Sequence, residues 1–89
     1  MKIISKEFGG HDDAAFLRVV WNMSIQEVEA LLSEVAVDLK WYKNFQPKGK
    51  IMGLFQKRDL SIIKSRISWI KQILASKKKN PDFIPDNYK

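Results

Sequence analysis

The chain has 89 residues, a formal net charge of +6 and no cysteine. This length suits one compact domain, and the lack of cysteine excludes a disulfide scaffold, a thiolate nucleophile and a cysteine-ligated zinc ion. No stretch has the roughly 18 uncharged apolar residues that would span a membrane, and the N-terminus lacks the apolar segment of a signal peptide. We therefore expect a cytoplasmic protein with one compact domain over residues 1–80 and a C-terminal tail over 81–89.

Charge is distributed unevenly along the sequence. Residues 1–39 contain three basic and seven acidic side chains, a net charge of −4, whereas residues 40–80 contain twelve basic side chains against Asp59 alone, a net charge of +11. The tail adds −1. A strongly basic segment of this kind is typical of a protein with an anionic partner. The alternative is that the two halves attract each other, or that their charges are simply solvated.

The N-terminal third is compatible with two structures. Asp12 or Asp13 can cap a short helix over residues 12–22, because carboxylates accept the backbone N–H groups that a first helical turn leaves unpaired. The same segment contains "FLRVVW", which is rich in strand-forming residues, and "KIISKEF" can pair with it as a β-hairpin. The two alanines that follow the aspartates favour the helix.

A long helix is predicted over residues 25–44. Ser24 and Glu27 have the spacing of a capping box, and Met23 and Val28 have that of the accompanying hydrophobic staple. Apolar residues recur every three or four positions and so share one buried face, which comprises Val28, Leu31, Leu32, Val35, Leu39 and Tyr42. A thinner stripe on the opposite face comprises Ala30, Val37 and Trp41. Either a neighbouring element covers this stripe, or it is an exposed patch that binds a partner.

Pro47 and Gly49 interrupt the pattern, and a second long helix is predicted over residues 51–78. Its apolar residues form two adjacent stripes over about half of the circumference, which suits packing against two elements. One stripe comprises Met52, Leu60, Ile63, Ile67, Ile70 and Leu74, and the other comprises Ile51, Phe55, Ile62, Trp69 and Ile73. A break at Gly53 or Asp59 is the alternative to one continuous helix.

These elements predict a mainly α fold. We expect an antiparallel hairpin of two long amphipathic helices, about 25–44 and 51–78, with a short N-terminal helix or β-hairpin packed across it. A helix-turn-helix in the N-terminal half is a weaker alternative. The helix after Ser24 continues without the glycine-containing turn that usually introduces a recognition helix.

Catalytic and metal-binding signatures are not evident in the sequence. His11 beside Asp12 and Asp13 is far short of a metal-ligand set, and a capping role already accounts for the carboxylates. The stretch "GKIMG" lacks the pattern of a phosphate-binding loop, and no serine has a histidine or lysine base at a recognisable spacing. We therefore expect a non-enzymatic protein without a metal or cofactor.

The stretch "KWYKNFQPKGK", residues 40–50, combines lysines with aromatic residues, as nucleic-acid-binding surfaces do. Tyr42 belongs to the core stripe and Phe45 is expected to fold over the core, so Trp41 is the aromatic predicted to stack on bases. Lysines of the second helix extend the basic surface over about 40 Å. The predicted nucleic-acid-binding residues are Lys40, Trp41, Lys43, Lys48, Lys50, Lys57, Lys64, Lys71, Lys77, Lys78 and Lys79.

The sequence thus favours an accessory protein that binds DNA or RNA, or the machinery that acts on them, mostly independently of base sequence. The alternative is a small regulator or inhibitor, such as phages encode, that docks on the acidic surface of a larger enzyme. Its contact residues would be Ala30, Val37 and Trp41, together with the second apolar helix faces. The same faces would also serve a helix-mediated homodimer.

Overall fold

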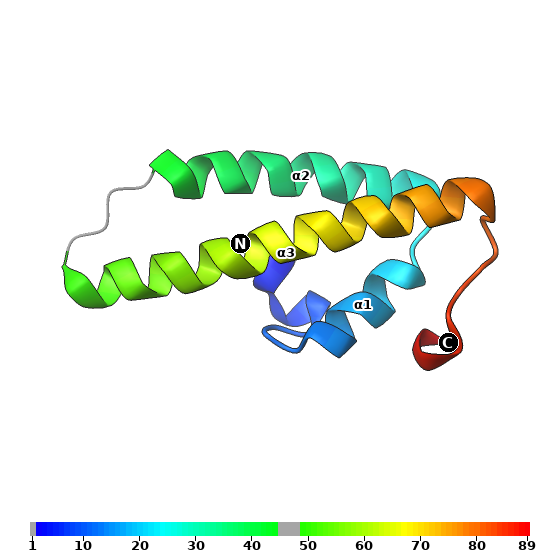
Figure 1. Ribbon diagram of the computed structural model, residues 1–89, viewed down its shortest axis with the longest axis horizontal. Helices are drawn as coiled ribbons and strands as arrows, with labels where there is room; N and C mark the ends of the chain where they lie inside the picture. The colour runs from blue at the N-terminus through cyan, green and yellow to red at the C-terminus, as the bar shows by residue number, and fades with distance from the viewer. Residues whose placement is uncertain (1, 45–48) are drawn as a thin grey trace.

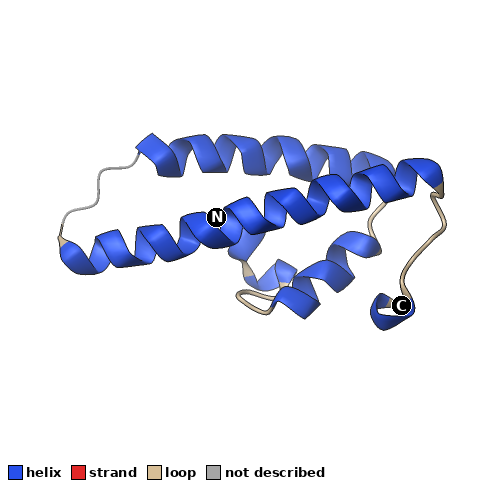
Figure 2. Ribbon diagram, viewed as in Figure 1, coloured by secondary structure: helices blue, strands red, loops and turns tan. Residues whose placement is uncertain are grey.

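A computed structural model of the protein describes residues 2–44 and 49–89 and shows a mainly helical fold (Figure 1). The described residues contain no strand (Figure 2), so the predicted helical class is confirmed. The long elements are α1 (Asp13–Trp21), α2 (Ile25–Asn44) and α3 (Lys50–Lys79). Short 3-10 turns are η1 (Lys2–Ile4), η2 (Lys6–Phe8) and η3 (Asp86–Tyr88).

The two long helices lie side by side and run in opposite directions, and α1 lies on the other side of α3 (Figure 1). α3 has 30 residues, which corresponds to about 45 Å of helix. The molecule measures 46 × 22 × 17 Å. α3 therefore runs along nearly the whole length of the molecule, without a break at Gly53 or Asp59.

The start of α2 has the predicted capping box. The backbone N–H of Ser24 donates to Glu27 Oε1 at 3.1 Å, and the backbone N–H of Glu27 donates to Ser24 Oγ at 3.2 Å. Each hydrogen bond satisfies a donor that the first helical turn leaves unpaired. The hydrogen bond from the Ser24 backbone, and then that with its side chain, hold the pKa of Glu27 below its ordinary value.

One apolar core lies where α3 meets α2, α1 and the N-terminal segment. In α2 and α3 its buried apolar residues all come from the predicted stripes, although Ile67 is only partly buried. The side chains of Ile51, Met52 and Phe55 lie outside the described ones. The buried apolar residues are Ile3, Phe8, Phe16, Val20, Val28, Leu31, Val35, Ile63, Ile70, Ile73 and Leu74.

The N-terminal third forms a helix rather than a β-hairpin. Asp12 Oδ1 accepts the backbone N–H groups of Ala14 at 3.0 Å and Ala15 at 3.2 Å, which caps α1. Gly9 has a φ of +78° in the turn before this cap, and a Cβ there would lie 2.4 Å from the Ala15 Cβ. Glycine is therefore required at this turn by both conformation and space.

Arg66 is fully buried in the middle of the α3 core face, which the apolar pattern did not predict. Its Nη1 donates to the Ile3 carbonyl oxygen at 2.6 Å, and its Nη2 donates to Asp13 Oδ1 at 3.3 Å. The guanidinium carbon lies 4.4 Å from the centre of the Phe16 ring. One side chain of α3 therefore ties both the N-terminal segment and α1 to the long helix.

The residues predicted as a C-terminal tail contact α1. Phe83 packs edge-to-face on Trp21 with ring centroids 5.9 Å apart, and Asn22 Nδ2 donates to the Tyr88 carbonyl oxygen at 2.9 Å. The segment after α3 thus folds back beside the end of α1 (Figure 1).

Candidate nucleic-acid interface

Four lysines stand in a row along the outer face of α3. Lys57, Lys64, Lys71 and Lys78 are seven residues apart and all are exposed. Seven residues make nearly two helical turns, so each lysine is rotated by only about 20° around the helix axis from the one before it. Successive lysines are about 10.5 Å apart along the axis. Over its length of roughly 31 Å, this lysine row faces away from the buried side of α3.

Most of the exposed side chains beside the lysine row are hydroxyl or amide groups. Between Lys57 and Lys79, the exposed residues of α3 outside the row are Arg58, Ser61, Ser65, Ser68, Gln72 and Ala75. None of them is acidic. Within the described residues, no lysine of the row forms an ion pair. The positive field of the row is therefore not neutralised by a contacting carboxylate.

Asp59 is the one acidic residue of α3. Its side chain is only 19% exposed, and its Oδ1 lies 3.8 Å from Arg58 Nε. The pKa of Tyr42 is raised above its ordinary value, mainly by burial and then by the nearby charge of Asp59. Asp59 thus belongs to the contact between α2 and α3 and does not interrupt the lysine row.

Lys77 is placed differently from the prediction, which grouped it with Lys78 and Lys79 on the surface. It is 3% exposed, and its Nζ donates to the Trp21 carbonyl oxygen at 2.7 Å. The Nζ also lies 5.9 Å from the centre of the Trp21 ring. Burial lowers the pKa of Lys77. Its ammonium group therefore supports the end of α1 and does not face a partner.

The end of α2 carries three of the predicted residues. Lys40, Trp41 and Lys43 are exposed, and the Trp41 ring packs edge-on against Tyr42 at a centroid distance of 5.1 Å. Gln56 Nε2 donates to the Tyr42 carbonyl oxygen at 2.8 Å, which sets this end of α2 beside the start of the lysine row. Lys48 lies outside the described residues, and Lys50 begins α3 with a side chain that is not among those described.

Among the described residues, the second stripe of α2 is exposed. Ala30 is exposed, Val37 is 69% exposed and Trp41 is 58% exposed. Their positions face away from the core stripe of the same helix. Of the two alternatives that the sequence left open, the structure therefore shows the exposed one.

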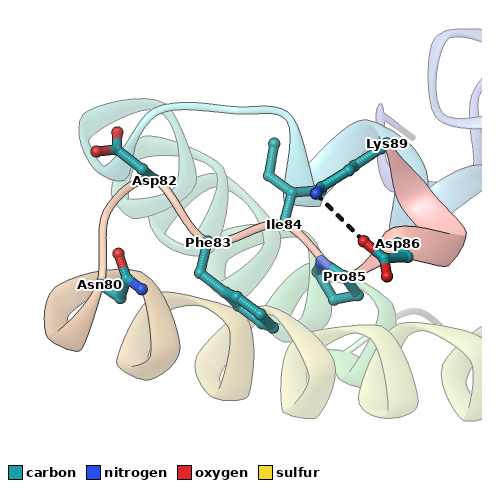
Figure 3. A pocket seen from close by; sticks show the side chains of 7 residues that line it. All are labelled: Asn80, Asp82, Phe83, Ile84, Pro85, Asp86 and Lys89. Atoms are coloured by element: carbon teal, nitrogen blue, oxygen red, sulfur yellow. Dashed lines mark ion pairs between the residues drawn. The ribbon is translucent and has the colours of Figure 1, made fainter.

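A hollow of about 430 Å³ lies at the C-terminal segment, lined by side chains between Asn80 and Lys89 (Figure 3). Its polar groups include the ion pair of Lys89 Nζ with Asp86 Oδ1, 3.2 Å apart.

No cluster of three potential metal ligands occurs in the described part of the chain. Among the described helices, none combines the length and the apolar character needed to cross a membrane.

Comparisons with protein-family models, with curated proteins and with solved structures found no match to this chain. Function is therefore inferred from the arrangement of the chain's own side chains.

Sequence reasoning placed the lysines correctly on α3 but missed which basic residues turn inward. Ile63, Arg66, Ile70, Ile73 and Lys77 follow one another at spacings of three and four, and all five are buried. This helical register runs through the centre of the apolar arc, so it was a usable signal. This register is overlooked when every charged residue is assumed to lie on the surface.

Proposed function

We propose that this protein is a non-enzymatic nucleic-acid-binding protein that contacts the phosphate backbone through the outer face of α3, mostly independently of base sequence. The proposal takes the two long helices as an antiparallel hairpin, with α1 packed across it. In this arrangement α2 and α1 bury one side of α3 and leave its lysine row facing solvent.

The lysine row is the observation that carries the proposal. Lysines bind phosphates by releasing the counterions condensed on a nucleic acid, and the gain grows with the number of phosphates contacted. Four exposed lysines at equal spacing, with hydroxyl and amide groups beside them and no contacting carboxylate among the described residues, suit this kind of binding. Serine and glutamine side chains also donate hydrogen bonds to phosphate oxygens.

A test compares the parent protein with the row variant, Lys57→Ala, Lys64→Ala and Lys71→Ala together. Alanine is the strongest helix former, so α3 should keep its structure. Binding to labelled nucleic acids is measured by fluorescence anisotropy at about 50 mM salt, where non-specific contacts are strong. We expect the parent to bind and the row variant to bind at least about tenfold more weakly.

The matched control is the off-row variant, Lys6→Ala, Arg18→Ala and Lys89→Ala together. These three basic residues are also exposed but lie on η2, on α1 and at the C-terminus. Both variants lower the net charge from +6 to +3. Equal weakening by the two variants would show a response to net charge, and no binding by the parent would reject the function.

A second candidate function is favoured by the exposed stripe of α2. Val37 and Trp41 are one helical turn apart and more than half exposed, and large aromatic residues are frequent anchors of protein interfaces. In this alternative the protein is a regulator that docks on a larger protein through Ala30, Val37 and Trp41, and its lysines steer association with an acidic surface.

Trp41→Ala separates the two candidates. A regulator anchored by Trp41 should lose its protein partner in an affinity pull-down from lysate, and nuclease treatment should not change the recovery by the parent. Recovery that disappears after nuclease treatment, and that the row variant also abolishes, supports nucleic-acid binding instead.

A further inference from the structure

We infer that the ligand of the lysine row is a double helix rather than a single strand. This inference rests on the proposed nucleic-acid function and specifies the form of the nucleic acid. Three features of the outer face of α3 support it: its charge, the lack of aromatic residues among its described exposed side chains, and the short side chains between the lysines.

The charge of the row favours a duplex. A double helix presents one phosphate charge per 1.7 Å or so of its axis, whereas each single strand presents about one per 3.4 Å. The row is held on one continuous helix and meets no contacting carboxylate among the described residues. A lysine row held on a rigid helix cannot bend to follow widely spaced phosphates. It is therefore attracted more strongly to the closely spaced phosphates of a duplex.

The described side chains on the outer face of α3 provide no stacking platform. Proteins that hold single strands place aromatic side chains where successive bases can stack on them. No aromatic residue is among the exposed side chains described for α3. Trp69 turns toward Phe16, with ring centroids 6.4 Å apart. The exposed Trp41 lies on α2, where its ring contacts Tyr42.

Short side chains between the lysines allow the backbone of a duplex to come close. Ser61 and Ser68 are exposed, and each lies four residues after one lysine of the row and three residues before the next. Their hydroxyl groups can donate to phosphate oxygens without holding the strand away from the helix. The Ser68 hydroxyl already accepts from Gln72 Nε2 at 3.3 Å, which leaves its own proton for a phosphate.

The length of the row sets the expected footprint. Lys57 and Lys78 are separated by roughly 31 Å along α3. At about 3.4 Å per base pair, this distance matches about nine base pairs. A duplex shorter than this cannot occupy all four lysines at once.

The experiment measures binding of the parent protein to four labelled ligands at one salt concentration. These are duplex DNA and duplex RNA of about 20 base pairs, and one strand of each as a single strand. We expect at least one duplex to bind about tenfold or more tightly than either single strand. The comparison of DNA with RNA identifies which double helix is preferred. Affinity should also fall steeply when the duplex is shorter than about nine base pairs.

The row variant should lose most of its duplex binding, and Trp41→Ala should keep it. Circular dichroism of both variants checks that helix content is retained, and the preference of the parent for a duplex needs no variant at all. Single strands that bind as tightly as duplexes, and that Trp41→Ala weakens, would overturn the inference while leaving the proposed function standing. Failure of the parent to bind any of the four ligands would overturn both.

Discussion

Lys77 and Lys78 are neighbours in the sequence with opposite environments. Lys77 is buried against the Trp21 carbonyl oxygen at the end of α1, whereas Lys78 closes the exposed lysine row. A chemically identical change at the two positions therefore separates a structural lysine from one proposed to bind phosphate.

We expect Lys77→Ala to lower the free energy of unfolding by about 1 to 3 kcal/mol, because it removes a charged hydrogen bond and the packing of a buried side chain. Lys78→Ala should change stability by less than about 0.5 kcal/mol but weaken nucleic-acid binding. Urea denaturation and anisotropy titrations measure the two effects. Equal stabilities of the two variants would show that Lys77 does not hold α1.

The capping box of α2 makes the stability of the protein sensitive to acid. The folded pKa of Glu27 is lowered by its hydrogen bonds with Ser24, so the unfolded chain binds the proton more tightly. The stabilisation is complete above the unfolded pKa, about 4.3, and is lost as the pH falls through the folded pKa. The parent should therefore lose part of its stability on acidification below roughly pH 4.3.

Glu27→Gln and Ser24→Ala provide the controls for this acid effect. Glutamine can still accept the Ser24 N–H but does not titrate, so Glu27→Gln should show less loss in acid. Ser24→Ala should cost about 1 kcal/mol at neutral pH, and its difference from the parent should shrink in acid. Thermal melting across the pH range measures both. An identical acid profile in all three proteins would argue against the cap.

The contacts that were easiest to predict from the sequence are those between residues close together in the chain. Ser24 and Glu27 are three positions apart and satisfy each other, so the cap needs no distant partner. Arg66 and Lys77 donate hydrogen bonds to the carbonyl oxygens of Ile3 and Trp21, which are 63 and 56 positions away. Their burial depends on where other elements dock, and the sequence alone does not state this.

At the scale of elements, Arg66 is the link between α3 and the N-terminal segment. We expect Arg66→Ala to lower the free energy of unfolding by about 2 to 5 kcal/mol, since it leaves a cavity and an unpaired Ile3 carbonyl oxygen. Hydrogen exchange should show faster exchange in residues 2–8 before any change in α2.

Arg66→Lys is the matched variant for this element contact. Lysine retains the positive charge but lacks the planar fork that reaches Ile3 and Asp13 together, so it should restore only part of the stability. Full stability in Arg66→Lys would mean that charge alone matters. Unchanged exchange of residues 2–8 in Arg66→Ala would show that this segment docks without Arg66.

The elements themselves were predictable to different degrees. α2 occupies residues 25–44 as predicted, because caps and a long apolar period agree there. The helix predicted over 51–78 corresponds to α3, Lys50–Lys79. The N-terminal third was ambiguous, because "FLRVVW" has strand propensity while Asp12 offers a helix cap. Burial of Phe16 and Val20 on one face of α1 is a tertiary effect that overrides that propensity.

At the scale of the whole molecule, charge is segregated more sharply than the sequence totals suggest. Arg66 and Lys77 are buried, out of the ten basic residues in 40–80 whose side chains the structure describes. The exposed residues of α2 before Lys40 include Glu27, Glu29 and Glu34, whereas the exposed face of α3 carries the lysine row. The molecule thus presents a basic face along roughly 31 Å of its 46 Å length, which is the property that the proposed function uses.

The most direct test of the lysine row is the salt dependence of binding to a duplex. Each lysine on a phosphate contributes a slope of about −0.9 to log affinity against log salt, so four contacts predict about −3.6 for the parent. The row variant, which lacks Lys57, Lys64 and Lys71, should show a slope near −0.9, while the off-row variant should stay close to the parent. A row variant with the same slope as the parent would contradict binding through α3.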